Sequence, residues 1–242
     1  MRVGVIGGGL MGSGIAEVCA RAGVDVTVVE ADDERAERSR AAIEAVIEDE
    51  TLKQDVFRRL DELLPDARFL ASNTSSVPIM KLGAQTKHPG RVLGMHFFNP
   101  VPVLPLVEIV TSIMTEPETV ELVREFAQET LGKQCIDSQD RAGFVVNALL
   151  IPYLLSAIRM YESGFASKEG IDQGMVLGCA HPMGPLALSD LIGLDTLLAV
   201  SESLYDEFRD PASVAPALLN RMVEAGLLGR KSGRGFYEYA KN

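Results

Sequence analysis

The chain has 242 residues, 47% of them hydrophobic and 24% charged, the balance of an ordinary soluble globular protein with one large domain or two modest ones. No stretch approaches the roughly 20 apolar residues of a membrane-spanning helix, so we expect no membrane association. The formal net charge of −11 argues against nucleic acid as a partner, because binding a polyanion needs a basic surface.

The first 30 residues have the pattern of a strand, a glycine-rich turn, a helix and a second strand. Val3, Val5 and Ile6 predict a buried strand of a parallel sheet. A helix is expected over residues 10–21, and Gly23 lies just beyond its end, where glycine commonly stops a helix. The second strand is expected to close on an acid, Glu30.

The turn carries the pattern G-x-G-x-x-G, which is a weak signal alone. Here it follows a strand and opens a helix, and an acid closes the next strand about 20 residues on, which is the context of a dinucleotide site. Glu30 would bind the adenosine ribose and repel a 2′-phosphate, so NAD is favoured over NADP; the alternative is a glycine-rich turn with an incidental acid. The expected cofactor-binding residues of the turn are Gly7, Gly9, Leu10, Met11 and Gly12.

The middle of the first half contains few clear strands. Residues 33–64 are almost all helix-friendly, so the third and fourth strands of a doubly wound half are nearly missing, and only residues 43–48 could form one. Residues 68–76 predict a strand running into a polar turn, and residues 91–100 predict another with His96 at its carboxyl end. Ligands bind outside the carboxyl ends of such strands, so both segments should face the cofactor.

Further elements follow in chain order. Residues 105–110 predict a strand and residues 133–138 a short one. Between them we expect a helix over residues 116–132, capped near Thr115 and stopped by Gly132. After residue 140 the pattern changes to amphipathic helices and loops, with no strand until GRGFYEY near the end. We therefore expect a nucleotide-binding domain over residues 1–140 and a helical domain over 141–242.

Several separated motifs can be compared together. In chain order they are GGGLMGSGIAEVCARAG, IEAVIED, ASNTSS, GMHFFNPVP…LVE, AGFVVNALLIPYL, GCAHPMGPLALSDLIGLDT and GRKSGRGFYEY. In that order they resemble the 3-hydroxyacyl-CoA dehydrogenase family, the short-chain 3-hydroxybutyryl-CoA type in particular. The resemblance implies an α/β fold with an NAD-binding Rossmann domain, followed by an all-α C-terminal dimerisation domain of the 6-phosphogluconate-dehydrogenase-like type. It also implies reversible oxidation of a (3S)-3-hydroxyacyl-CoA to the 3-ketoacyl thioester.

The segment HFFNPVPVLPLVE, residues 96–108, supports that chemistry on its own. Its three prolines argue against a helix or an inner strand, yet it has a histidine at one end and a glutamate at the other. Removing hydride from a secondary alcohol requires a base for the hydroxyl proton, and an imidazole with an ordinary pKa of about 6.5 suits this. We predict that His96 is the base and that Glu108 fixes its tautomer. The alternatives are a core histidine bonded to a carbonyl and a surface carboxylate.

The resemblance implies further site residues. Ser75 and Asn147 match positions that hydrogen-bond the reacting oxygen of the substrate, where donors stabilise alkoxide-like charge. Asn73 and Asn99 match positions near the nicotinamide and its ribose. Cofactor contacts are further implied for Ser75, Glu48, Lys53 and Lys231, with a solvated surface lysine as the alternative for the two lysines. We assign no function to His88, and a structural one to His181.

The sequence departs from the family pattern near residues 41–46, where RAAIEA and IEAVIED are fused. In the family that this chain resembles, the missing segment contains a helical arm with cationic contacts to the adenosine phosphates of CoA. Either a mobile arm is left out of the sequence as given, or the chain is truly shortened. The first is favoured, because a true deletion would remove the third strand and expose neighbouring edges.

Two rival functions remain open at this level: a dehydrogenase of a free hydroxy acid or sugar acid on the same scaffold, and a non-catalytic NAD-binding protein. The expected partners are an acyl-CoA substrate and a second copy of the chain, in fatty-acid metabolism such as β-oxidation.

The N-terminal residues have the pattern of a strand and a glycine turn, and not that of a leader segment, which argues for the cytoplasm. Cys19, Cys135 and Cys179 are far apart, so we expect buried thiols and no metal site.

Overall fold

The computed structural model describes residues 2–29 and 41–240 of the chain. It divides into two compact units, Met1–Phe144 and Val145–Asn242. Glu30, the predicted ribose-binding acid, lies outside the described residues. Each unit is described by itself below.

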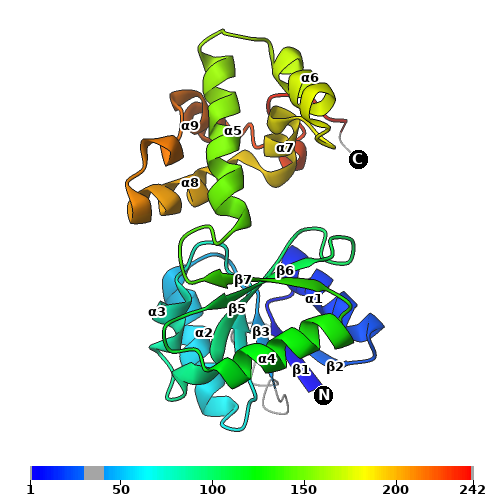
Figure 1. The fold of residues 1–242 in the computed structure, drawn as a ribbon, viewed down its shortest axis with the longest axis vertical. Helices are drawn as coiled ribbons and strands as arrows, with labels where there is room; N and C mark the ends of the chain where they lie inside the picture. The colour runs from blue at the N-terminus through cyan, green and yellow to red at the C-terminus, as the bar shows by residue number, and fades with distance from the viewer. Residues whose placement is uncertain (1, 30–40, 241–242) are drawn as a thin grey trace. The chain divides into compact units, whose positions relative to one another are not determined.

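The first unit is built on a seven-stranded sheet in the order β2-β1-β3-β4-β5-β6-β7 (Figure 1). The strands from β2 to β5 are parallel, β6 runs antiparallel to β5, and β7 is parallel to β6. Their bounds are β1 Arg2–Ile6, β2 Asp25–Val29, β3 Ala42–Glu44, β4 Leu70–Ser72, β5 Val92–Phe97, β6 Leu106–Thr111 and β7 Gln134–Gln139. The predicted strands are therefore present, although β4 is shorter than its sequence pattern suggested.

The strand whose existence was least certain, β3, lies beside β1 on the side away from β2. In a doubly wound half of order 3-2-1-4-5-6, this is the place of the fourth strand. The place of the third strand, beyond β2, is not filled by any described residue. Consistent with an edge position, Val28 of β2 is 44% exposed. The described sheet is thus missing one strand on its β2 side.

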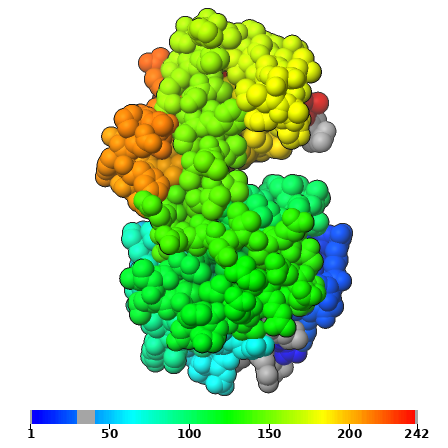
Figure 2. All heavy atoms as spheres, in the orientation of Figure 1, coloured from blue at the N-terminus to red at the C-terminus, as the bar shows by residue number. Residues whose placement is uncertain are grey.

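Helices cover both faces of this sheet (Figure 1). On one face, α1 (Leu10–Arg21) and α4 (Pro117–Glu125) bury residues such as Ile15 and Val123. On the other, α2 (Glu50–Leu63) and α3 (Ile79–Gly83) bury Phe57 and Leu82. In Figure 2 the atoms of α4 and its neighbours close over the face in view. The inner strands β1, β3, β4 and β5 are buried over nearly their whole length because both sides of the sheet are packed there.

The predicted helix over residues 116–132 differs in detail. After α4 the chain continues as a π-helical turn over Phe126–Thr130. The helix begins after Glu116, next to the cap expected near Thr115, but no side chain caps it: the Thr115 hydroxyl donates to the Val92 carbonyl over 2.8 Å. Gly132 follows with a φ of 66°, the left-handed conformation expected of a helix stop.

The second unit is helical. Its helices are α5 Val146–Glu162, α6 Lys168–Cys179, α7 Pro185–Ile192, α8 Leu194–Phe208 and α9 Ala217–Glu224. The strand expected in GRGFYEY is wrong: the described tail forms only isolated bridges, Gly229 to Arg234 and Arg234 to Glu238. Its backbone is instead fixed by the buried carboxylate of Asp190, which accepts from the N–H groups of Phe236 and Tyr237, each over 2.9 Å. In this tail the Asp190 carboxylate therefore accepts hydrogen bonds that a neighbouring strand would accept in a sheet.

Two expectations from composition can be compared with the structure. None of the described helices is long and apolar enough to cross a membrane. The cysteines are free, but only Cys19 is fully buried, and burial raises its pKa to about 12. Cys135 is partly buried and Cys179 is exposed, so the expectation of three buried thiols is wrong. Cys179 lies in the last turn of an amphipathic helix, where one face meets solvent.

Candidate active site

The first unit pairs His96 with Glu108 across two adjacent strands. The antiparallel register of β5 and β6 sets the two residues opposite each other. His96 Nδ1 lies 2.6 Å from Glu108 Oε2, with His96 4% exposed and Glu108 fully buried. The expectation that residues 96–108 contain no inner strand is wrong at both ends: His96 and Glu108 lie on inner strands, and the prolines are confined to the loop between those strands. Strand register is a more rigid way to hold the pair.

Ser75 completes a chain of three side chains. It lies in the turn after β4, the neighbour of β5, and its Oγ is 3.0 Å from His96 Nε2. A carboxylate only accepts hydrogen bonds, so Glu108 assigns the proton to Nδ1 and leaves Nε2 free to accept. The histidine is therefore set to take a proton at Nε2 from a hydroxyl, which is what alcohol oxidation needs.

Aromatic rings and an amide fix the surroundings of this chain. The rings of Phe98 and Phe144 lie 4.7 and 5.4 Å from the His96 ring, centroid to centroid. Asn73 Oδ1 accepts from the backbone N–H of Phe97 over 2.9 Å, which joins the end of β4 to the end of β5. His96 is held by ring packing and by the Glu108 carboxylate. The alternative interpretation, a core histidine bonded to a carbonyl, is therefore wrong.

A second polar cluster lies beside the first. Lys53 of α2 is 1% exposed, and its Nζ lies 2.7 Å from Oε1 of the fully buried Glu44, the last residue of β3. Ser72 donates to the other oxygen of Glu44 over 2.5 Å. Lys53 Nζ is also 3.2 Å from Glu48 Oε2. The reading of Lys53 as a solvated surface lysine is therefore wrong.

Replacing Lys53 by methionine should destabilise the first unit by about 3–5 kcal/mol, because the Glu44 carboxylate would be left buried without its counter-ion. Urea unfolding of the ligand-free protein measures this. The matched control is Lys81→Met, since Lys81 pairs with Glu50 at the surface and both side chains are about half exposed; its cost should stay below about 1 kcal/mol. Equal midpoints for the two variants would contradict the account.

Glu48 lies in the loop between β3 and α2 and contacts the turn of residues 74–76. Its Oε1 accepts from the N–H groups of Ser75 and Ser76, over 2.9 and 3.0 Å. Partial burial opposes ionisation, but the Lys53 charge and the hydrogen bonds from Thr74, Ser76 and Ser75 outweigh it and lower the pKa of Glu48. Glu48 thus stays a carboxylate throughout the neutral range, and its contribution to stability is lost only as pH falls below the ordinary range of a glutamate, about 4.3.

The glycine turn fits a dinucleotide. Gly7 has a φ of 98°, and a Cβ at Gly12 would lie 1.8 Å from the Gly7 carbonyl oxygen, so neither position tolerates a side chain. A Cβ at Gly9 would meet nothing within 4 Å, which leaves open space at the start of α1. No side chain caps this helix and no acid lies in its first turn. These features suit a bound pyrophosphate.

The other predicted residues are placed less decisively. Asn99 is exposed in the loop after β5, and Leu10 and Met11 open α1. Lys231 forms an ion pair with Asp195 within the second unit, 46% exposed. Asn147 lies in the first turn of α5, also in the second unit. The cofactor and substrate roles of these residues stay predictions.

Sequence reasoning missed Glu44, Ser72 and Thr74. A usable signal was present for Glu44, since a carboxylate that follows Ala41, Ala42 and Ile43 in a strand must find a partner when buried.

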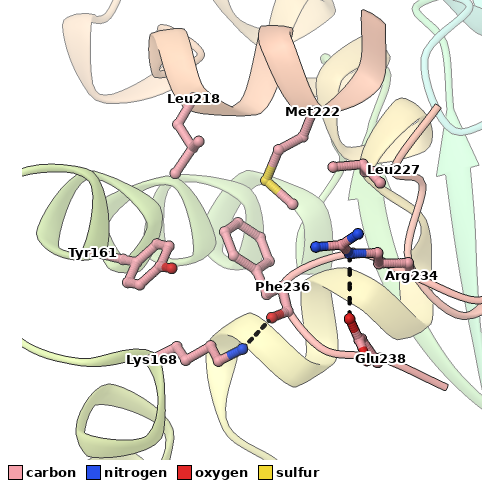
Figure 3. A pocket seen from close by; sticks show the side chains of 9 residues that line it. Tyr161, Lys168, Leu218, Met222, Leu227, Arg234, Phe236 and Glu238 are labelled. Atoms are coloured by element: carbon pink, nitrogen blue, oxygen red, sulfur yellow. Dashed lines mark hydrogen bonds and ion pairs between the residues drawn. The ribbon is translucent and has the colours of Figure 1, made fainter. Parts of the chain in front are cut away.

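The second unit also has a hollow, lined by apolar residues and by Lys168 and Arg234 (Figure 3). Both cations there have partners, the Phe236 carbonyl at 2.7 Å and the Glu238 carboxylate at 3.7 Å. No described group of three or more His, Cys, Asp or Glu could hold a metal ion.

Comparison with known families decides what this site belongs to. The NAD binding domain of 3-hydroxyacyl-CoA dehydrogenase matches residues 2–44 and 39–141, and the C-terminal domain of the same enzymes matches residues 143–239. The chain belongs to the 3-hydroxyacyl-CoA dehydrogenase family. The predicted family, the fold class, NAD as cofactor and the class of enzyme, an NAD-dependent dehydrogenase, are confirmed. Residues 39–44 match twice, as expected where part of the family pattern is missing between two joined pieces.

Individual relatives agree. A 3-hydroxybutyryl-CoA dehydrogenase of Mycobacterium tuberculosis is 53% identical over 281 aligned positions, covering 98% of both chains. The human mitochondrial hydroxyacyl-coenzyme A dehydrogenase is 37% identical, covering 98% of this chain and 90% of its own. Because 281 positions exceed the 242 residues of this chain, the relative has residues with no counterpart here.

Solved structures of this family have the same fold. The crystal structure of FadB2 from Mycobacterium tuberculosis superposes with a TM-score of 0.96 at 51% identity, covering 99% of each chain. The (S)-3-hydroxybutyryl-CoA dehydrogenase of Ralstonia eutropha superposes with a TM-score of 0.93 at 40% identity, again covering 99% of each chain. The dehydrogenases of this family therefore share the fold described above.

Proposed function

We propose that the protein catalyses the reversible oxidation of (3S)-3-hydroxybutyryl-CoA to acetoacetyl-CoA, with His96 as the general base. The single observation that carries this proposal is the chain from Ser75 Oγ through the His96 ring to Glu108, with contacts of 3.0 and 2.6 Å. The names of the relatives from Mycobacterium tuberculosis and Ralstonia eutropha support the four-carbon substrate.

The reaction follows from the geometry of these groups. The substrate hydroxyl donates its proton to His96 Nε2 while Glu108 holds Nδ1 and balances the charge of the imidazolium. Ser75, already within hydrogen-bond reach of Nε2, donates to the oxygen as negative charge develops on it. Bound NAD supplies the acceptor for the hydride. In the reverse direction His96 returns the proton to the same oxygen.

The remaining residues have proposed supporting roles. Asn147 would be a second donor to the reacting oxygen, and Asn73 and Asn99 would lie near the nicotinamide and its ribose. Lys53 and Lys231 would contribute to the cofactor site. Glu30 would bind the adenosine ribose and favour NAD over NADP.

The test is consumption of NADH with acetoacetyl-CoA, run beside acetoacetate as the free acid. We expect turnover of the thioester and none of the free acid above background. Turnover of the free acid at a comparable kcat/KM would favour the alternative, a hydroxy-acid dehydrogenase, which the missing CoA-binding piece motivates. NADH binding without turnover of either compound would favour a non-catalytic NAD-binding protein.

The missing piece gives a further prediction about CoA itself. If the cationic arm is absent, replacing acetoacetyl-CoA by acetoacetyl-pantetheine, which lacks the adenosine phosphates, should lower kcat/KM by less than about tenfold, equivalent to about 1.4 kcal/mol. Steady-state kinetics with both thioesters measure the ratio. A loss above about hundredfold would mean that other residues bind the nucleotide.

We further propose a cytoplasmic homodimer formed through the helical unit, acting in β-oxidation or the reverse synthesis. Support for the dimer comes from exposed apolar side chains on that unit: Leu149, Phe165 and Leu177 are 74%, 80% and 82% exposed. Large apolar side chains that are exposed in this way are common at subunit contacts. The mass in solution by light scattering tests it, and a monomer at micromolar concentration would contradict it.

A further inference from the structure

The catalytic serine belongs to a turn whose donors converge on one carboxylate oxygen. Glu48 Oε1 accepts from the N–H groups of Ser75 and Ser76 over 2.9 and 3.0 Å. It also accepts from the Ser76 hydroxyl over 2.8 Å and from the Thr74 hydroxyl. A carboxylate can accept several such bonds, whereas a neutral group of the same size has fewer lone pairs and no charge. Glu48 therefore holds the turn together with Thr74, whose Oγ1 accepts from the N–H groups of Ser76 and Val77 over 3.2 and 2.8 Å.

The carboxylate itself is anchored to the core. Its second oxygen, Oε2, lies 3.2 Å from Lys53 Nζ. Lys53 is in turn fixed by the fully buried Glu44 at the end of β3 and by the carbonyl of Val46. The path from the sheet to the turn is thus continuous: Glu44, Lys53, Glu48, then the backbone of Ser75.

From these contacts we propose that Glu48 is a positioning residue for catalysis: its carboxylate fixes the turn of residues 74–76 so that Ser75 Oγ stays in reach of His96 Nε2. The inference rests on the proposed function, in which Ser75 binds the reacting oxygen. It differs from the cofactor contact expected for Glu48, because a cofactor contact acts on NADH affinity and a positioning role acts on the rate of the bound complex.

The geometry makes the rate sensitive to Glu48. Without the carboxylate, the Ser75 N–H loses its acceptor on Glu48, whereas the Ser76 N–H still donates to Thr74 Oγ1, so the Ser75 side chain is released to move. A displacement of about 1 Å in a reacting group can cost about 10² in rate. Fixed donors at a developing oxyanion are likewise worth about 10²–10³ in kcat. We expect Glu48→Ala to lower kcat by about 10²-fold with both substrates saturating.

The experiment compares Glu48→Ala with Glu50→Ala. Glu50 is two residues away, lies at the surface and pairs with Lys81 over 2.7 Å, so the control loses an equivalent carboxylate outside the network. For each variant we would measure kcat with NADH and acetoacetyl-CoA, the Kd of NADH by fluorescence, and kcat with added formate. Because the Glu48 side chain is 40% exposed, formate can enter the vacated space and accept from the same N–H groups.

The proposal predicts a large fall in kcat for Glu48→Ala, at least severalfold recovery with formate, and neither effect for Glu50→Ala. A kcat within about threefold of the parent overturns it, whatever happens to the Kd of NADH, and so does a fall that formate leaves unchanged. If the alanine variant does not fold, Glu48→Gln serves instead, with an expected fall of about tenfold and an unchanged kcat as the contrary result. A parent protein without turnover would count against the proposed function and not against Glu48.

Discussion

Replacing His96 by glutamine should lower kcat for reduction of acetoacetyl-CoA by about 10²- to 10⁴-fold, the range that general acid–base groups contribute. Glutamine can still hydrogen-bond Glu108 but cannot give or take a proton at neutral pH. The effect should therefore fall on the catalytic step, and the Kd of NADH should change by less than about threefold. Steady-state kinetics with saturating NADH, together with a fluorescence titration, separate the two quantities.

The chain offers a matched control for this substitution. His88 lies in a surface turn, with its side chain 60% exposed and its Nδ1 3.4 Å from Asp61. His88→Gln makes the same chemical change away from the site and should leave kcat within about twofold. An active His96→Gln variant, or an equal loss in both variants, would remove His96 from the mechanism.

Glu108→Gln should produce the second large effect, a fall in kcat of about 10²-fold or more. The amide can present its NH₂ group to His96 Nδ1, which stabilises the tautomer protonated at Nε2, and that tautomer cannot accept the substrate proton. Substrate and cofactor contacts are not changed directly, so KM should move far less than kcat.

The control is Glu121→Gln at a surface position, where Glu121 is 75% exposed and 3.7 Å from Arg124. It should retain full activity. Because Glu108 is fully buried, its variant must first be shown to fold, by circular dichroism and by an unchanged Kd for NADH. A folded Glu108→Gln variant with normal kcat would show that the carboxylate does not set the tautomer.

Much of the first unit could be predicted from the sequence, for a physical reason. Its strands are short apolar runs bounded by polar turns, and the glycine turn has local steric requirements that only glycine meets, as the φ of 98° at Gly7 shows. His96 and Glu108 could be paired in advance because the needed chemistry is specific to an imidazole and a carboxylate. The mechanism of their pairing was not predictable, since the antiparallel register of β5 and β6 depends on non-local packing.

The network around Glu48 was beyond local reasoning. Glu44, Lys53 and Thr74 come from a strand, a helix and a turn that are separated in sequence, and only the sheet order β1-β3-β4 brings them together. The tail GRGFYEY was wrongly predicted as a strand. Its aromatic residues favour a strand, but the N–H groups of Phe236 and Tyr237 donate to the carboxylate of Asp190. In both cases a carboxylate, Glu48 or Asp190, accepts backbone hydrogen bonds that local patterns assign to neighbours in the chain or sheet.

The central claim is that His96 and Glu108 act as one unit, and a double-variant cycle tests it most directly. The measurement is kcat of His96→Gln, Glu108→Gln and the double variant, with saturating NADH and acetoacetyl-CoA. Groups that work as a unit are strongly non-additive, so the double variant should be no more than about threefold slower than His96→Gln. If the two losses multiply instead, the two residues act independently, and the account of Glu108 as the group that orients His96 is contradicted.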